Sequence, residues 1–88
     1  WEGNINVSKL SQYLKLDANQ HEEVANICEY FTEQMERATS ARKNQEKLLR
    51  DAVYGNLKLM KRTLNEKQYA DYAKVLNVTL QNKGIEVK

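Results

Sequence analysis

Proline is absent from this 88-residue chain, and glycine occurs only at positions 3, 55 and 84. Because the stretch from Gly3 to Gly55 contains neither residue that interrupts helices, the sequence favours helices over a β architecture. Cysteine occurs once, at Cys28, which excludes an intrachain disulfide. No apolar run approaches the roughly 20 residues of a transmembrane helix, and no export signal is recognisable.

The composition is that of a folded globular domain rather than a disordered chain. Charged residues make up 30% and hydrophobic residues 41% of the sequence. We expect a single helical domain over 1–88, with loose ends at 1–6 and 85–88. The net charge of +2 is too small to indicate a nucleic-acid or membrane-surface partner. Trp1 has no preceding methionine, so we expect a processed or truncated chain.

Two segments carry the same signal for the start of a helix. A short polar residue suits the N-cap, where its side chain accepts a hydrogen bond from a free backbone N–H. A glutamine three residues later can accept a bond from the cap's own N–H, which closes a capping box. A leucine precedes each cap; Leu64 has Tyr69 as its hydrophobic-staple partner, whereas Leu16 has the weaker His21. The motif residues are Leu16, Asp17 and Gln20, and Leu64, Asn65 and Gln68.

Apolar residues at helical spacing predict an all-α fold with a short N-terminal helix and three longer ones. Asn6 is the candidate cap of the first helix, and Gly84 is placed to end the last. The expected helices are Val7–Lys15, Ala18 to about Ala38, about Asn44 to Arg62, and Glu66 to about Asn82.

The polar interval from Thr39 to Lys47 allows two arrangements. It either contains a turn, with Ser40 or Asn44 as the next cap, or continues one rod of about 45 residues and nearly 70 Å. The rod would leave its apolar face bare unless a second chain covered it. We favour the hairpin, because small domains use short helices with brief connections.

The third expected helix has apolar residues over nearly half its circumference, which indicates more than one neighbour. Asn56 lies within that arc and needs a partner if it is buried; we favour a loop carbonyl or a water over a role in fixing the register of helices or chains. Tyr13, Tyr69 and Tyr72 are expected in the core, whereas Val75 and Val78 point off the apolar stripe.

Charge is divided between the two central helices. Residues 18–38 carry five acids and one base, a net charge of −4, and residues 42–62 carry seven bases and two acids, a net charge of +5. We favour two complementary solvated faces, because exposed ion pairs contribute only about 0–1 kcal/mol each. The alternative is a partner surface made of basic residues and the two tyrosines that point off their stripes: Arg42, Lys43, Lys47, Arg50, Lys58, Lys61, Arg62, Tyr30 and Tyr54.

No pattern indicates catalysis or a cofactor. His21 is the only histidine, and it lies two helical turns from Cys28, too far for both to bind one metal ion with Glu22. No glycine-rich phosphate loop is present. A nucleophile with a base and an orienting group cannot be assembled from these residues, so we expect no enzymatic activity.

The doubled leucine–cap–x–x–glutamine pattern resembles the LTXXQ-motif family, the Spy and CpxP type of small helical periplasmic proteins. The order of helices and motifs is also similar, although Asp17 and Asn65 stand where the family has threonine. The resemblance implies export to the periplasm and a role in envelope stress, by binding unfolded chains or a signalling partner. It also implies thin, cradle-shaped dimers that are basic on the concave face. The alternative is a structural or interaction domain that self-associates through its helices.

Overall fold

The computed structural model describes residues 5–87 and is all-α, as the sequence predicts. Four helices follow one another along the chain: α1 (Val7–Leu14), α2 (Ala18–Ser40), α3 (Gln45–Thr63) and α4 (Glu66–Asn82). The predicted boundaries agree within two residues at every helix end. Asn6 caps α1, since its Oδ1 accepts a hydrogen bond from the Lys9 backbone N–H at 3.0 Å.

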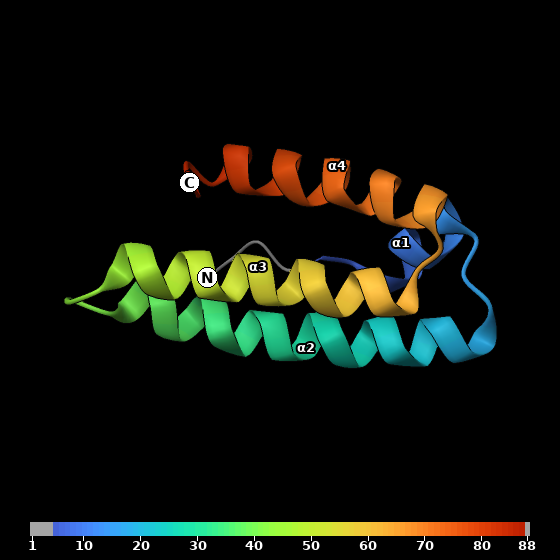
Figure 1. Ribbon diagram of the computed structural model, residues 1–88, viewed down its shortest axis with the longest axis horizontal. Helices are drawn as coiled ribbons and strands as arrows, with labels where there is room; N and C mark the ends of the chain where they lie inside the picture. The colour runs from blue at the N-terminus through green and yellow to red at the C-terminus, as the bar shows by residue number, and fades with distance from the viewer. Residues whose placement is uncertain (1–4, 88) are drawn as a thin grey trace.

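The longest helices, α2 and α3, form the antiparallel hairpin that the sequence favours over a single rod (Figure 1). Asn44 occupies the N-cap position of α3 in the left-handed conformation, with φ of 60°, and its side chain makes no capping bond. The Gln45 amide instead donates to the carbonyls of Ala38 and Thr39, at 3.3 and 3.1 Å. These bonds tie the end of α2 to the start of α3 across the turn.

The remaining two helices cover the hairpin. α4 packs against α3, and α1 packs against α2 and α4 near the helix starts (Figure 1). The broad apolar arc of α3 therefore contacts two neighbours, as its width predicts. The most deeply buried large side chains come from α2, α3 and α4: Tyr72, Met35, Met60, Leu76 and Val24.

The C-terminal end of α4 is a Schellman turn. Gly84 has φ of +70°, which glycine adopts without steric cost. Its N–H donates to the Gln81 carbonyl at 3.0 Å, and the Ile85 N–H donates to the Leu80 carbonyl at 2.9 Å. The turn directs the chain back, so that Ile85 and Val87 pack against the core.

The ends of the chain are therefore less loose than the sequence suggests, where the structure describes them. Ile5 is half-buried and packs against the core, as Ile85 and Val87 do. Residues 1–4 and Lys88 lie outside the described residues.

Two side-chain predictions are wrong, both on the flanks of helices. Tyr13 is 58% exposed, because Leu10 and Leu14 define the buried side of α1 and Tyr13 lies about 100° from Leu14 around the helix. Val75 is half-buried against the core rather than pointing off it, whereas Val78 is exposed as predicted. Tyr72 is fully buried, as predicted.

Asn56 is buried, with 3% of its surface exposed. Its Oδ1 accepts a hydrogen bond from the Tyr72 hydroxyl of α4, so its partner is a side chain of a neighbouring helix and not the favoured loop carbonyl. The Asn56 Nδ2 has no acceptor among the described residues. The bond agrees with the alternative, in which Asn56 fixes the register between helices.

Candidate functional site

Both predicted capping boxes are present. At the start of α2, the Asp17 carboxylate accepts from the Gln20 N–H at 2.8 Å, and the Gln20 Oε1 accepts from the Asp17 N–H at 3.1 Å. At the start of α4, Asn65 and Gln68 exchange the same two bonds at 2.8 and 3.0 Å. Leu64 is buried beside them, as a hydrophobic staple requires.

The structure also brings the two boxes together. The Gln20 Nε2 donates to the Gln68 Oε1 at 2.8 Å and to the Thr63 carbonyl at 3.1 Å. The Gln68 Nε2 donates to the Leu14 carbonyl at 3.2 Å. Since Leu14 ends α1 and Thr63 ends α3, each glutamine starts its own helix and satisfies a carbonyl at the end of another. This glutamine junction is structural and positions all four helices.

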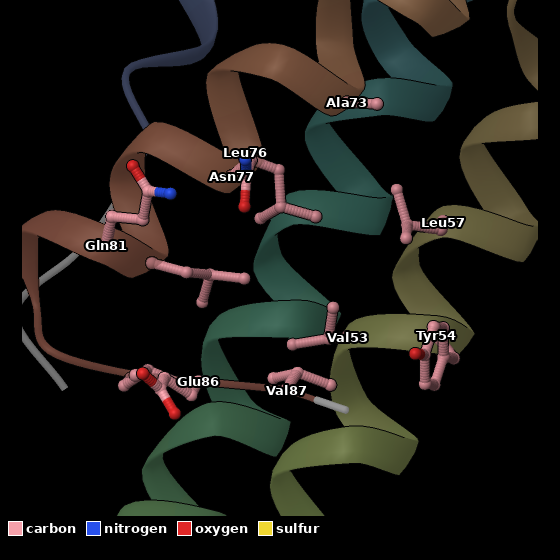
Figure 2. Close-up of a pocket in the computed structure, with 11 residues that line it drawn as sticks. Val53, Tyr54, Leu57, Ala73, Leu76, Asn77, Gln81, Glu86 and Val87 are labelled. Atoms are coloured by element: carbon pink, nitrogen blue, oxygen red, sulfur yellow. The ribbon is translucent and has the colours of Figure 1, made fainter.

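An open groove of about 480 Å³ lies between α3 and α4. Figure 2 shows its lining side chains, which come from both helices and from the C-terminal segment. The lining is mostly apolar, and the polar side chains Asn77 and Gln81 lie on its α4 side. The lining residues are Val53, Tyr54, Leu57, Ala73, Leu76, Asn77, Leu80, Gln81, Ile85, Glu86 and Val87. Sequence reasoning identified Tyr54 but missed the α4 side, where Ala73, Asn77 and Gln81 follow each other at four-residue spacing.

Exposed basic residues lie along one face of α3, beside the groove-lining Tyr54. Four of the predicted partner-surface residues and Tyr54 succeed one another at steps of three and four, which places them on one face of the helix. All five are exposed, Tyr54 by 50%. We call this set the basic stripe: Lys47, Arg50, Tyr54, Lys58 and Lys61.

The other predicted surface residues lie apart from the stripe. Arg42 and Lys43 are exposed in the turn before α3, and Arg62 is exposed in the last turn of α3. Tyr30, on α2, is 53% exposed but does not line the groove. Tyr54 belongs to both the groove lining and the basic stripe, and the stripe places four of the seven basic residues beside it on α3.

Opposite charges on α2 and α3 do not meet in direct pairs. The two ion pairs found in residues 5–87 each lie within one helix, Lys47 with Asp51 at 4.0 Å and Lys67 with Asp71 at 3.8 Å. Both pairs are largely solvated and contribute little. Of the basic residues in the stripe, Lys47 pairs with Asp51, whereas Arg50, Lys58 and Lys61 form no ion pair within residues 5–87.

A second hollow of about 330 Å³ lies between α1 and α4. The exposed Tyr13 lines it, together with Lys9 and Val75. It is smaller than the groove and has no basic stripe along its edge, so it is the weaker candidate site.

Two buried groups, the Cys28 thiol and the Tyr72 hydroxyl, have a raised pKa, and neither lines the groove. Burial raises the pKa of the Cys28 thiol to about 11, which keeps it protonated and unreactive near neutral pH. Burial also raises the pKa of the Tyr72 hydroxyl. His21 and Glu22 are exposed, and residues 5–87 hold no group of three or more His, Cys, Asp or Glu side chains arranged to bind a metal ion. The groove is lined by apolar side chains together with the polar groups of Tyr54, Asn77, Gln81 and Glu86.

Comparisons with protein-family models, with curated proteins and with solved structures give no match to this chain. Within residues 5–87, no helix has the combined length and apolar character needed to cross a bilayer.

Proposed function

We propose that this protein binds extended segments of other proteins non-covalently, in the groove between α3 and α4. The observation that carries the proposal is the juxtaposition of an open apolar groove with the basic stripe of α3. Apolar lining from Val53, Leu57 and Leu76 suits hydrophobic side chains. Lysine and arginine along the edge favour segments that also carry acidic residues.

The size of the groove suits weak, reversible binding. A volume of about 480 Å³ is that of a small-ligand pocket and accommodates only a few side chains of a partner. Exposed charges mainly accelerate encounter and lose effect at high salt. Short-lived, salt-sensitive contact with many unfolded chains is the behaviour of a chaperone-like protein.

The resemblance to the LTXXQ-motif family supports the same role. Both helix-start motifs form capping boxes, although Asp17 and Asn65 replace the family's threonine. By this resemblance we propose a periplasmic location, where the protein would hold unfolded clients or contact a signalling partner during envelope stress. An export signal in the full gene would support this location, and its absence would count against it.

The test is suppression of client aggregation, measured by light scattering. Reduced α-lactalbumin serves as an acidic client and reduced lysozyme as a basic one. We expect stoichiometric amounts of the protein to delay aggregation of the acidic client more strongly, and added salt to weaken the effect. No delay with either client would refute the proposal.

Charge reversal then locates the surface. Arg50→Glu with Lys61→Glu should abolish most of the delay, because both positions lie on the basic stripe. Lys9→Glu with Arg37→Glu changes the net charge equally at exposed positions off the stripe and serves as the control. Equal loss in both variants would mean that net charge, rather than the groove edge, governs the effect.

Self-association is the second candidate. Five large apolar or aromatic side chains are exposed on the described surface: Tyr13, Tyr30, Leu48, Tyr54 and Val78. Such side chains would be covered if two copies paired through their helices. A homodimer in sedimentation, combined with no effect on clients, would favour this candidate over client binding.

A further inference from the structure

The turn that joins α2 to α3 forms one end of the molecule. Figure 1 shows this turn at the end of the long axis, beyond the end of α4. The molecule measures 39 Å along that axis and 21 and 19 Å across it. Residues 42–48 are all exposed. We call residues 37–48, the turn together with the adjoining helical turn of α2 and of α3, the hairpin tip.

The hairpin tip concentrates positive charge. Its only acid is Glu46, and its four exposed bases are Arg37, Arg42, Lys43 and Lys47, so that its net charge is +3. Since the whole chain carries +2, the remaining residues together carry −1. At a rise of about 1.5 Å per residue, the four bases lie within about 5 Å of the turn along the helix axes, less than a Debye length at physiological salt. They therefore act together on any surface that approaches this end, which the small net charge of the whole chain does not indicate.

An apolar side chain lies among these bases. Leu48 is 40% exposed, follows Lys47 directly and lies in the first turn of α3. Lysine and arginine near a bilayer are attracted by anionic lipid headgroups. An exposed leucine beside them can enter the boundary between headgroups and acyl chains. The composition of the tip therefore suits the surface of an anionic membrane.

Two features favour a membrane over a nucleic acid as the partner. Proteins that bind single strands stack bases on aromatic side chains, and residues 32–53 contain no aromatic residue. The tip is also a narrow, projecting end of two helices (Figure 1), which a flat lipid surface accepts without a complementary shape.

From these observations we infer that the hairpin tip binds the surface of a bilayer that contains anionic lipids, with α2 and α3 directed away from that surface. No residue of the tip lines the groove between α3 and α4, so both surfaces can be occupied at once. The inference goes beyond the proposed function of the groove and does not depend on it.

Vesicle co-sedimentation tests the inference. The probes are vesicles of phosphatidylcholine alone and vesicles of equal parts phosphatidylcholine and phosphatidylglycerol, each mixed with the full chain at low salt. We expect binding to the anionic vesicles only, and its loss at high salt because counter-ions screen the bases. Absence of binding to the anionic vesicles would overturn the inference.

Paired variants locate the contact. Arg42→Gln with Lys43→Gln should weaken vesicle binding about 25-fold, since each base near an anionic surface contributes about fivefold. Lys58→Gln with Lys61→Gln changes the net charge equally, but at exposed positions of α3 about 20 Å from the turn, and should change the affinity less than about twofold. Equal weakening by both pairs, with helical circular dichroism retained, would overturn the tip as the contact surface.

Leu48 distinguishes a membrane from other polyanions. Leu48→Ser should weaken binding to the anionic vesicles several-fold, because its apolar side chain no longer enters the interface, and should not change any binding of a single-stranded oligothymidylate. Val78→Ser, at an exposed position of α4 outside the tip, is the matched control and should leave vesicle binding unchanged. Tighter binding to the oligonucleotide than to the vesicles, or vesicle binding that is unaffected by Leu48→Ser, would overturn the membrane as the partner.

Discussion

Replacing Gln68 by alanine should destabilise the fold far more than the loss of one helix cap would. The side chain is buried, with 9% of its surface exposed, and both ends of its amide are used. Its Oε1 accepts from the Asn65 N–H at 3.0 Å and from the Gln20 Nε2 at 2.8 Å. Its Nε2 donates to the carbonyl of Leu14 at 3.2 Å.

The expected magnitude follows from these three bonds. At about 1 kcal/mol net for each, Gln68→Ala should lower the free energy of unfolding by about 3 kcal/mol. In a domain of this size that lowers Tm by more than about 10 °C. Gln20→Ala should have a smaller effect, because Gln20 is only half-buried.

The measurement is urea unfolding followed by circular dichroism, arranged as a double-mutant cycle. The two single variants and the double variant should show a coupling of about 1 kcal/mol or more between Gln20 and Gln68, since the side chains bond directly. Gln12→Ala, at an exposed position of α1, is the matched control and should change stability by less than about 0.5 kcal/mol. Additive effects at the two glutamines would refute the junction.

Three further predictions concern the interior and α3. Asn56→Leu alone and Tyr72→Phe alone should each lower the free energy of unfolding by about 1–3 kcal/mol, measured by urea unfolding, because each leaves the other residue's buried polar group unpaired. The double variant should recover most of that loss, since neither group of the pair remains. Additive effects in the double variant would contradict the hydrogen-bonded pair. Gly55→Ala should raise the free energy of unfolding by about 0.5–1 kcal/mol in the same assay, because alanine favours the helical conformation of this position. The added Cβ would have no neighbour within 4 Å. A lower free energy of unfolding would mean that the methyl group clashes. Since burial raises the pKa of Cys28 from 9.0 to about 11, the folded state holds a proton that the unfolded state releases in that range. Stability should therefore be complete below about pH 9 and fall toward pH 11, more steeply in the native chain than in Cys28→Ala; equal slopes would contradict this.

Sequence reasoning located the helix ends because the signals there are local. A cap and its return residue lie within one turn, so Asp17 with Gln20 and Asn65 with Gln68 can be read without knowing the fold. The same holds for Gly84, whose place after the last helix predicts the left-handed turn.

The predictions that failed depend on distant contacts. Tyr13 lies beside the apolar face of α1, and whether a neighbour covers it is decided by α4, more than 50 residues later. The Asn56 partner is on another helix, and no periodicity within α3 indicates it. The groove itself is formed by the spacing of α3 and α4 and by the return of residues 85–87 after Gly84, which only tertiary structure determines.

The glutamine junction explains a feature of the motif that the capping box alone does not. Glutamate at the third helical position would also close a box, because the return bond needs only an acceptor. Glutamine has an N–H₂ group left to donate, which a carboxylate lacks. Here the Gln20 Nε2 reaches the last carbonyl of α3 and the Gln68 Nε2 reaches the last carbonyl of α1. The cap position therefore accepts any short polar acceptor, such as Asp17 or Asn65, whereas the position three residues later requires both an acceptor and a donor, and this requirement is met by glutamine.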